Sequence, residues 1–245
     1  MESGFHPLIP DCATTILFDL DGTLRENQPS STEAFIDYAA ALGAEASSAQ
    51  RNALRRWTHY YWAQSPELLQ DVAAFKGSDS AFWTNYGRRS LLMLGCDAAQ
   101  SDRLAPQINE YMEVEHRPVN YVAPDVPVTL AALKAAGLRL GVLSNRTHPC
   151  QNELSELGLL EYFDLVLVAA EVLVWKPDPQ IFKAALERIQ GRPEETLYVG
   201  DNYYADILGA EAAGLHPVLI DPQGLFPEAN CPVIRTIGEL APDGR

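Results

Sequence analysis

Two aspartates stand one residue apart at the end of an apolar segment. The stretch ILFDLDGTLRE, residues 16–26, reads as a buried strand that runs into Asp19 and then Asp21. A buried strand normally stops at polar residues, so a strand end followed by a turn is the simplest explanation. Carboxylates also bind hard cations and act as nucleophiles in phosphoryl transfer. The pair could therefore be catalytic or metal-binding groups held at the end of a strand.

Other polar side chains stand at comparable places further along the chain. Ser144 and Asn145 follow the apolar stretch LRLGVL, and Asp201 follows TLYVG, with Asp206 five residues later. Lys176 lies in VWKPDPQIF, just before a predicted helix. If these apolar stretches are parallel strands, their carboxyl ends share one edge of a sheet, which is where such sheets bind ligands. Three acids, a hydroxyl and a lysine would then converge.

The elements that must position these residues alternate in type after Pro118. Strands are predicted at residues 14–19, 138–144, 163–169, 196–200 and 217–220, with a less regular one near 233–235. Helices are predicted at residues 127–136, in a short segment that ends at Gly158, and at 180–190 and 203–213. This alternation is typical of right-handed βαβ units, so we expect an α/β fold with a parallel sheet and helices on both faces.

The block from about Ser30 to His116 has a different texture. It is helical in pattern, with four predicted helices, and a capping box at Ser47 and Gln50 marks the start of the second. The fourth, residues 97–116, is expected to be interrupted at Pro106. We therefore expect an α/β core at residues 1–26 and 118–245, and an all-helical domain at residues 27–117 inserted after the first strand.

Four motifs in order resemble those of the haloacid dehalogenase-like hydrolase superfamily: DLDGTL, LSN, KPDPQIF and GDNYYADILGA. Each motif alone is weak, but the four together occupy the expected elements of a Rossmann-like core. The resemblance covers roughly residues 13–27 and 123–221. It implies that the helical insertion is the cap domain of this superfamily, of the helical (subfamily I) kind.

The resemblance gives the two aspartates of the first motif their roles. Asp19 is expected to be the nucleophile that forms an aspartyl-phosphate, and Asp21 the general acid and base. The metal ligands are expected to be Asp19, Asp201 and, through its backbone carbonyl, Asp21. Mg²⁺ is the expected cofactor, because it is a hard cation that prefers carboxylate, water and phosphate oxygens.

Thr23, Ser144, Asn145 and Lys176 are expected to bind the substrate phosphate, and a purely structural role in the turn is an equal alternative for Thr23. Lys176 would also neutralise the charge of the aspartates. Two further residues are expected to support the site: Gly22, which frees the backbone after Asp21, and Asp206. Asp206 either completes the metal site or holds Lys176 in place, with the second role slightly favoured.

The leading expectation is a Mg²⁺-dependent phosphatase that acts on a small phosphorylated metabolite. A phosphomutase would use the same aspartates, and a catalytically silent binding module on the same fold is the alternative outside enzymes. A dehalogenase or a phosphonatase is disfavoured, because members with those activities lack the second aspartate that Asp21 supplies. A phosphonatase also needs a lysine in the cap, where only Lys76 is present.

The composition of the chain disfavours some classes of binding partner. The formal charge of −15 disfavours a nucleic-acid partner, and no apolar run is long enough for a membrane span. The N-terminal stretch lacks a signal-peptide pattern, so a cytoplasmic location is expected. Arg51, Arg55 and Arg56 in the helical insertion either bind the substrate or form a solvated helix face. The same two alternatives apply to Arg88 and Arg89. The sequence predicts neither the particular substrate nor the oligomeric state.

Overall fold

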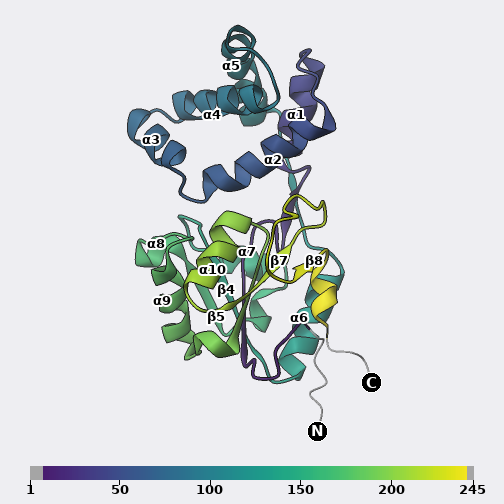
Figure 1. Cartoon of the computed structure of the whole chain (residues 1–245), viewed down its shortest axis with the longest axis vertical. Coiled ribbons are helices and arrows are strands. Elements are labelled where there is room, and N and C mark those ends of the chain that lie inside the picture. Colours follow the sequence, from purple (N-terminus) through teal and green to yellow (C-terminus); the bar gives the residue numbers. More distant parts are fainter. Residues whose placement is uncertain (1–7, 242–245) are drawn as a thin grey trace. The chain divides into compact units, whose positions relative to one another are not determined.

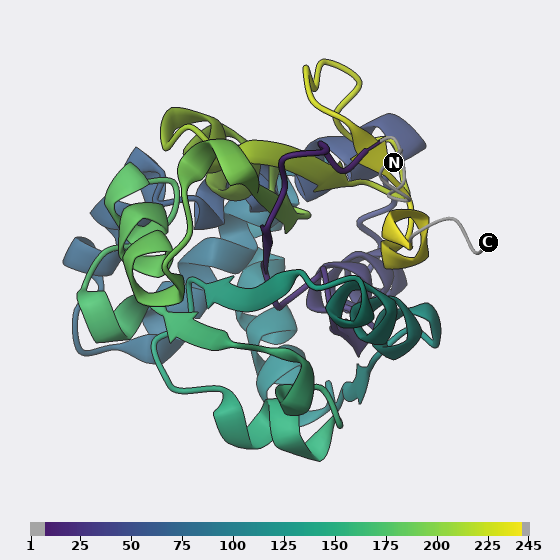
Figure 2. The ribbon, with the colours of Figure 1, turned by 90° about the horizontal axis from the view of Figure 1, so that it is seen from below.

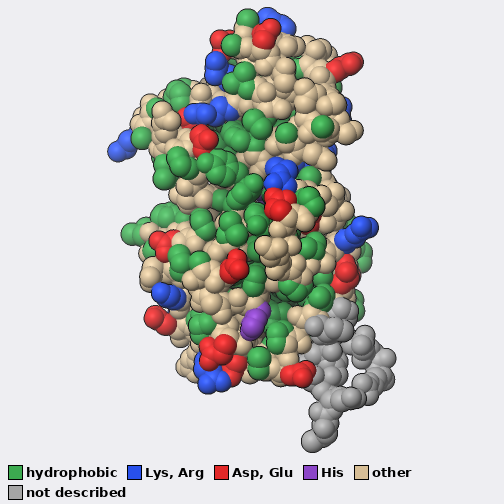
Figure 3. All heavy atoms as spheres, in the orientation of Figure 1, with side chains coloured by type: hydrophobic (Ala, Val, Ile, Leu, Met, Phe, Trp, Pro, Cys, Tyr) green, Lys and Arg blue, Asp and Glu red, His purple; other side chains and the backbone are tan. Residues whose placement is uncertain are grey.

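The computed structural model describes residues 8–241, which divide into two compact units (Figure 1). One unit comprises residues 8–26 and 122–241, and the other comprises residues 27–121. Among the described residues, no helix has both the length and the apolar character needed to cross a membrane. On the face drawn in Figure 3, acidic and basic side chains are interspersed rather than gathered by sign.

The first unit is built on a six-stranded parallel sheet in the order β5-β4-β1-β6-β7-β8. Its strands are β1 (Thr15–Phe18), β4 (Arg139–Ser144), β5 (Leu165–Val168), β6 (Thr196–Gly200), β7 (His216–Ile220) and β8 (Val233–Ile234). The predicted parallel α/β core is therefore confirmed.

Strand β1 lies in the middle of this sheet, and all four of its residues are buried. It pairs with β4 on one side and β6 on the other, so that Phe18 stands opposite both Val142 and Val199. The backbone N–H of Asp19 continues the ladder to the carbonyl of Val199 at 2.9 Å. The first aspartate of the DLDGTL motif is thus fixed by the hydrogen bonding of the central strand.

Helices cover both faces of the sheet (Figure 2). One face packs against α6 (Asp125–Ala135), α7 (Gln151–Glu156) and the 3₁₀ turns Leu160–Tyr162 and Ile237–Leu240. The other packs against α8 (Ala169–Val172), α9 (Pro179–Ile189) and α10 (Leu208–Ala212). A strand buried on both faces needs apolar side chains in both directions, which explains the unbroken apolar runs in the sequence.

The second unit is helical and has its own core. Its helices are α1 (Ser31–Ala41), α2 (Ser48–Trp62), α3 (Pro66–Ala74), α4 (Asp79–Met93) and α5 (Ala98–Val114). Helices α1, α2, α4 and α5 share a cluster of buried side chains that includes Phe35, Leu54, Leu91 and Leu104. The predicted capping box of Ser47 and Gln50 is present at the start of α2.

Two predictions for this helical unit are wrong. Helix α3 was not expected, although Ser65 caps it and Pro66 occupies its first turn. The expected break at Pro106 does not occur, because α5 runs through it without interruption. Buried residues lie on both sides of the proline, at Leu104 and Ile108, so packing outweighs the hydrogen bond that proline cannot donate.

Three features near the sheet also differ from expectation. The predicted helix at 203–213 is a π-helical turn, Tyr203–Ile207, followed by α10. The strand predicted at 163–169 covers only Leu165–Val168, because a 3₁₀ turn ends at its start, with Phe163 as the cap, and α8 begins at Ala169. Two short strands were not predicted, β2 (Glu26–Gln28) and β3 (Val119–Tyr121). They precede and follow the helices of the second unit in the sequence and pair with each other. Segments of three residues carry too little hydrophobic pattern to be recognised in a sequence.

Helix α6 offers a matched test of the core. Leu130 is fully buried against the sheet, whereas Val128, two residues earlier, is 69% exposed. We expect Leu130→Ala to lower the free energy of unfolding by about 2–5 kcal/mol, since it leaves a cavity. Val128→Ala should change it by less than about 0.5 kcal/mol. Urea denaturation followed by circular dichroism measures both, and equal effects would contradict the packing described for α6.

Candidate active site

The site begins with three neighbouring strand ends. Because β1 lies between β4 and β6, the residues at their carboxyl ends lie side by side: Asp19 after β1, Ser144 at the end of β4 and Asp201 after β6. Asp19 and Ser144 are buried, and Asp201 is partly buried. The convergence predicted from the sequence at one edge of the sheet is therefore present for these three residues.

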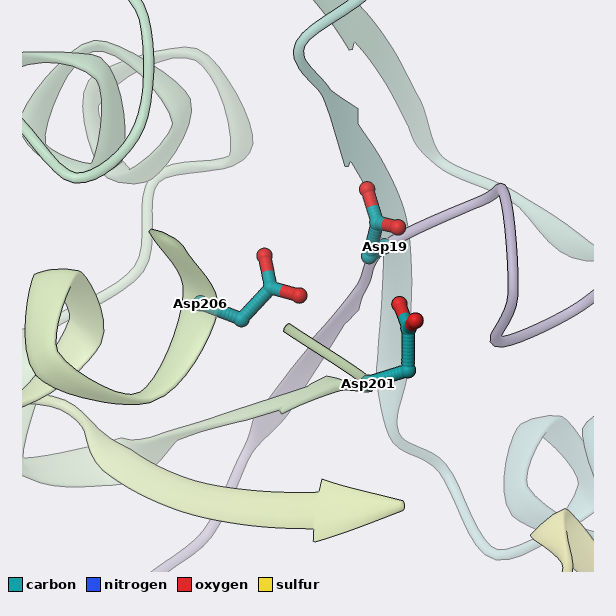
Figure 4. A group of neighbouring side chains, drawn as sticks. All are labelled: Asp19, Asp201 and Asp206. Carbon is teal, nitrogen blue, oxygen red and sulfur yellow. The ribbon is translucent and has the colours of Figure 1, made fainter. Parts of the chain in front are cut away.

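Three carboxylates gather at this edge. Asp19, Asp201 and Asp206 each offer an oxygen that lies within 4.8 Å of those of the other two. In Figure 4, the side chain of Asp206 points from its helical turn toward the space between Asp19 and Asp201. Carboxylate oxygens at this spacing form a donor set that suits a hard divalent cation. The cluster can thus hold a metal ion.

The electrostatics of the cluster favour a cation. Burial raises the pKa of Asp19 from 3.8 to about 7, and it outweighs the opposing attraction of Lys176. Burial also raises the pKa of Asp201 well above its usual value, with repulsion from Asp19 and Asp206 adding to the effect. Such shifts mark carboxylates that are costly to keep ionised without a compensating positive charge.

Lys176 supplies one positive charge from within the protein. Its ammonium group donates to Asp19 Oδ1 at 2.6 Å, to Asp206 Oδ1 at 2.6 Å and to the Tyr198 hydroxyl at 2.9 Å. These three contacts use all three N–H bonds of the ammonium. Although burial opposes its charge, the two carboxylates raise the pKa of Lys176, which therefore stays protonated. The expectation that Asp206 holds Lys176 agrees with this geometry.

Asn145 positions the lysine through its backbone. The Asn145 side-chain carbonyl accepts from the Lys176 N–H at 2.7 Å, and the side-chain NH₂ donates to the Lys176 carbonyl at 2.9 Å. The amide side chain is therefore engaged with the lysine loop in this structure. The predicted binding of phosphate by Asn145, Ser144 and Lys176 stays a prediction.

Tyr198 belongs to the site but was missed in the sequence. It is fully buried in β6, and its hydroxyl lies 3.0 Å from the Leu143 carbonyl oxygen and 3.2 Å from Asp206 Oδ1. A tyrosine hydroxyl in a strand that is buried on both faces needs a polar partner, and this need is the one feature of the sequence that points to Tyr198. The sequence does not show that the partner would be the lysine of a distant loop.

Gly22 and Thr23 lie beside Asp201. Gly22 has a φ of +87°, and a Cβ there would stand only 2.5 Å from Asp201 Oδ2. The glycine is therefore required both by its backbone conformation and by the close approach of the carboxylate. The Thr23 hydroxyl donates to Asp201 Oδ1 at 3.4 Å. In this structure Thr23 thus supports the carboxylate cluster, and its contact with phosphate stays a prediction.

The side chain of Asp21 has different partners. Arg146 holds it through two parallel hydrogen bonds, Nε to Oδ2 at 2.6 Å and Nη2 to Oδ1 at 2.7 Å. Arg25 Nε lies 3.0 Å from the same Oδ1. Neither arginine was predicted from the sequence, because their pairing depends on how the turn after β1 meets the loop after β4.

Four of the five arginines named as candidates for substrate binding are engaged within the helical unit. Arg51 donates to the Ala46 carbonyl at 3.2 Å, and Arg55 pairs with Glu33 at 2.8 Å. Arg88 pairs with Asp102, and Arg89 pairs with the buried Asp71 at 2.8 Å. These contacts give Arg51, Arg55, Arg88 and Arg89 structural roles, and whether Arg51, Arg55 or Arg56 binds substrate stays open.

The chain is similar to known proteins over most of its length. A model of the haloacid dehalogenase-like hydrolases matches residues 13–214. A ribulose-1,5-bisphosphate 5-phosphatase from Halopiger xanaduensis is 32% identical over 214 residues, which cover 86% of this chain and 85% of that relative. A phosphoserine phosphatase from Thermus thermophilus is 31% identical over 234 residues, which cover 87% and 90%.

A solved structure gives a similar result. The crystal structure of a 2-haloacid dehalogenase from Pseudomonas syringae pv. Tomato aligns over 93% of this chain and 96% of its own, with 27% identity and a TM-score of 0.52.

The raised pKa of Asp19 predicts a pH-dependent stability. Folding raises the pKa of Asp19 from 3.8 to about 7, so between these values the folded state binds a proton that the unfolded state has lost. The contribution of Asp19 to the free energy of unfolding is therefore fully present below pH 3.8, and it is lost as the pH rises toward 7. The uncharged side chain of Asp19→Asn does not titrate. In chelator, the stability of this variant relative to wild type should therefore grow from pH 4 to pH 7, by up to about 1.4 kcal/mol per pH unit.

Thermal unfolding at each pH measures this difference. Asp37→Asn, on the exposed side of α1, is the matched control and should keep a constant offset from wild type. An offset for Asp19→Asn that does not vary with pH would show that Asp19 titrates normally.

Proposed function

The chain belongs to the haloacid dehalogenase-like hydrolases, as its four motifs predict, and we propose that it is a Mg²⁺-dependent phosphatase of small phosphorylated metabolites. The observation that carries this proposal is the setting of Asp19. Its carboxylate is held at the tip of the central strand by the Lys176 ammonium at 2.6 Å and stands beside Asp201 and Asp206. Phosphoryl transfer needs a nucleophile and positive charge beside it; here Lys176 supplies one charge, and the neighbouring carboxylates could hold a cation that supplies more.

In the proposed reaction, a carboxylate oxygen of Asp19 attacks the phosphorus of the monoester. The bond between phosphorus and the ester oxygen breaks, and Asp21 gives its proton to that oxygen, so the alcohol leaves. Water then attacks the aspartyl-phosphate and gives a proton to Asp21. The P–O bond to Asp19 breaks, and inorganic phosphate is released with both aspartates restored.

The carboxylate cluster supports the assignment of the metal. Asp19 and Asp201, with the Asp21 backbone carbonyl that the family motif indicates, would hold Mg²⁺. Asp206 is assigned to Lys176, which it contacts at 2.6 Å. The bound ion would neutralise charge on the phosphoryl oxygens. The fit rests on partly desolvated carboxylates whose mutual repulsion a cation would relieve.

Lys176 and Tyr198 keep the nucleophile in place. The lysine holds Asp19 Oδ1, which directs the carboxylate and offsets the negative charge of the approaching phosphate. The tyrosine and Asp206 fix the other two N–H bonds of the ammonium. In the proposed enzyme the helical unit, residues 27–121, serves as the cap that excludes bulk water.

The relatives support a small substrate, because their names specify ribulose 1,5-bisphosphate and phosphoserine. A dehalogenase is disfavoured despite the similar crystal structure, because displacement of a halide needs no proton donor and Asp21 would have no role. A phosphomutase uses the same aspartates and is distinguished by where the phosphoryl group goes.

We expect wild type to release inorganic phosphate from ribulose 1,5-bisphosphate, phosphoserine or both, the substrates that the names of the two relatives give. Release should require Mg²⁺ and stop in chelator. Asp19→Asn should lower kcat by at least about 10⁴-fold, because the amide cannot form the covalent intermediate. Asp37→Asn, with the same change in charge, should behave like wild type.

Transfer to a second sugar hydroxyl without phosphate release would favour the phosphomutase instead. Binding of Mg²⁺ without turnover of any phosphate ester would favour the silent binding module.

The covalent intermediate can be observed directly. We expect acid quenching during turnover to trap one phosphoryl group on the peptide that contains Asp19, detected by mass spectrometry and removed by neutral hydroxylamine. A Lys176→Met variant should accumulate less of it, because Asp19 loses its counter-charge. Phosphate release without any phosphorylated Asp19 peptide would mean that water attacks the ester directly.

A further inference from the structure

The side chain of Asp21 belongs to a network of two arginines and two acids: Arg25, Arg146, Asp21 itself and Glu153. Arg146 contacts both oxygens of Asp21, at 2.6 and 2.7 Å, and also pairs with Glu153 of α7. Arg25 lies between the same two acids, 3.0 Å from Asp21 and 3.1 Å from Glu153. Two positive and two negative charges balance one another at this place, within a chain whose formal charge is −15.

This arrangement is at odds with the role of Asp21 in the proposed reaction. To protonate the leaving oxygen, Asp21 must direct a carboxyl oxygen at the ester. In the structure Arg146 holds both oxygens in a fork-to-fork pair, the strongest geometry between these groups. Asp21 must therefore leave Arg146 before it can act. That departure would leave Nε of the partly buried guanidinium without its carboxylate, while Glu153 stays on the two Nη groups.

The burial of the four side chains shows which of them can be exchanged. Arg25 is 10% exposed, Arg146 21% and Glu153 23%, whereas Asp21 is 43% exposed. Arg146, Arg25 and Glu153 thus form the fixed part of the network, and Asp21 is its most accessible member. A guanidinium released by one carboxylate will bind another fork-shaped oxyanion, a carboxylate or a phosphate, in the same geometry.

We propose that Arg146 is a specificity-determining residue that exchanges Asp21 for a second anionic group on the substrate. This inference rests on the proposed phosphatase function. The leaving alcohol of the substrate carries a carboxylate or a further phosphate, which takes the place of Asp21 on Arg146. The exchange frees Asp21 to donate its proton to the ester oxygen. Esters whose alcohol is uncharged leave Asp21 on Arg146 and react slowly.

The test compares substrates that differ in the charge of the alcohol. Phosphoglycolate supplies a carboxylate, ribulose 1,5-bisphosphate supplies a second phosphate, and glycerol phosphate supplies neither. Wild type should favour one or both anionic esters in kcat/KM by at least about 10-fold. The arm that is favoured identifies carboxylate or phosphate as the group that Arg146 binds.

Arg146→Gln removes the charge and the fork. We expect it to lower kcat/KM for the favoured anionic ester by roughly 10- to 100-fold, the size of a lost charge-assisted pair. Its kcat for glycerol phosphate should rise, because the two-bond grip of Arg146 on Asp21 is gone and only the single contact from Arg25 is left among those described. Arg188→Gln is the control, since Arg188 pairs with Glu171 away from this network. Thermal unfolding of each variant checks that it is folded.

Equal losses on anionic and uncharged esters in folded Arg146→Gln would overturn the proposal and make Arg146 only a support for Asp21. A wild type without preference between the esters would overturn it as well. Both outcomes include phosphate release, so they are distinct from failure of the phosphatase function, in which no ester is hydrolysed.

Discussion

The site depends on one buried ammonium group. Lys176 is 2% exposed and is the point where the carboxylates of Asp19 and Asp206 and the hydroxyl of Tyr198 meet. Without it, two acids would lie unpaired in a desolvated place, which a folded chain avoids by taking up protons. With it, Asp206 can be fully buried and Asp19 can be kept close to ionisation at the tip of a strand.

The order of the strands brings the partners of Lys176 together. Asp19 and Tyr198 come from adjacent strands, and the lysine reaches them from a loop that the end of β4 holds. Gly200, the last residue of β6, leaves space for Asp206, because a Cβ there would stand 2.4 Å from its carboxylate. The close packing of acids is therefore achieved by removing side-chain atoms from the backbone around them. Buried ion pairs of this kind contribute little to stability, because the cost of desolvating the charges offsets their attraction.

The sequence was sufficient for the parts of the site that follow from strand ends. Asp19, Ser144 and Asp201 could be predicted to meet because a run of buried apolar residues ends at each, and parallel strands place those ends together. Tyr198 and Arg146 could not, because their roles depend on which strands are neighbours and on the path of two loops. The order of the strands itself carries no local signal. In the helical unit, the signals of α3 were present at Ser65 and Pro66, and the continuity of α5 through Pro106 is decided by packing that a local pattern does not contain.

The two hydrogen bonds between the Asn145 side chain and the backbone of Lys176 imitate the pairing of two strand residues. In effect, they add one rung to the sheet beyond the end of β4, with a side chain in place of a backbone. The lysine is thereby registered to the sheet and not to the length of the loop that precedes it. Val174 and Trp175, just before the lysine, are held as well, because they pack against the core cluster that includes Phe182 and Tyr198.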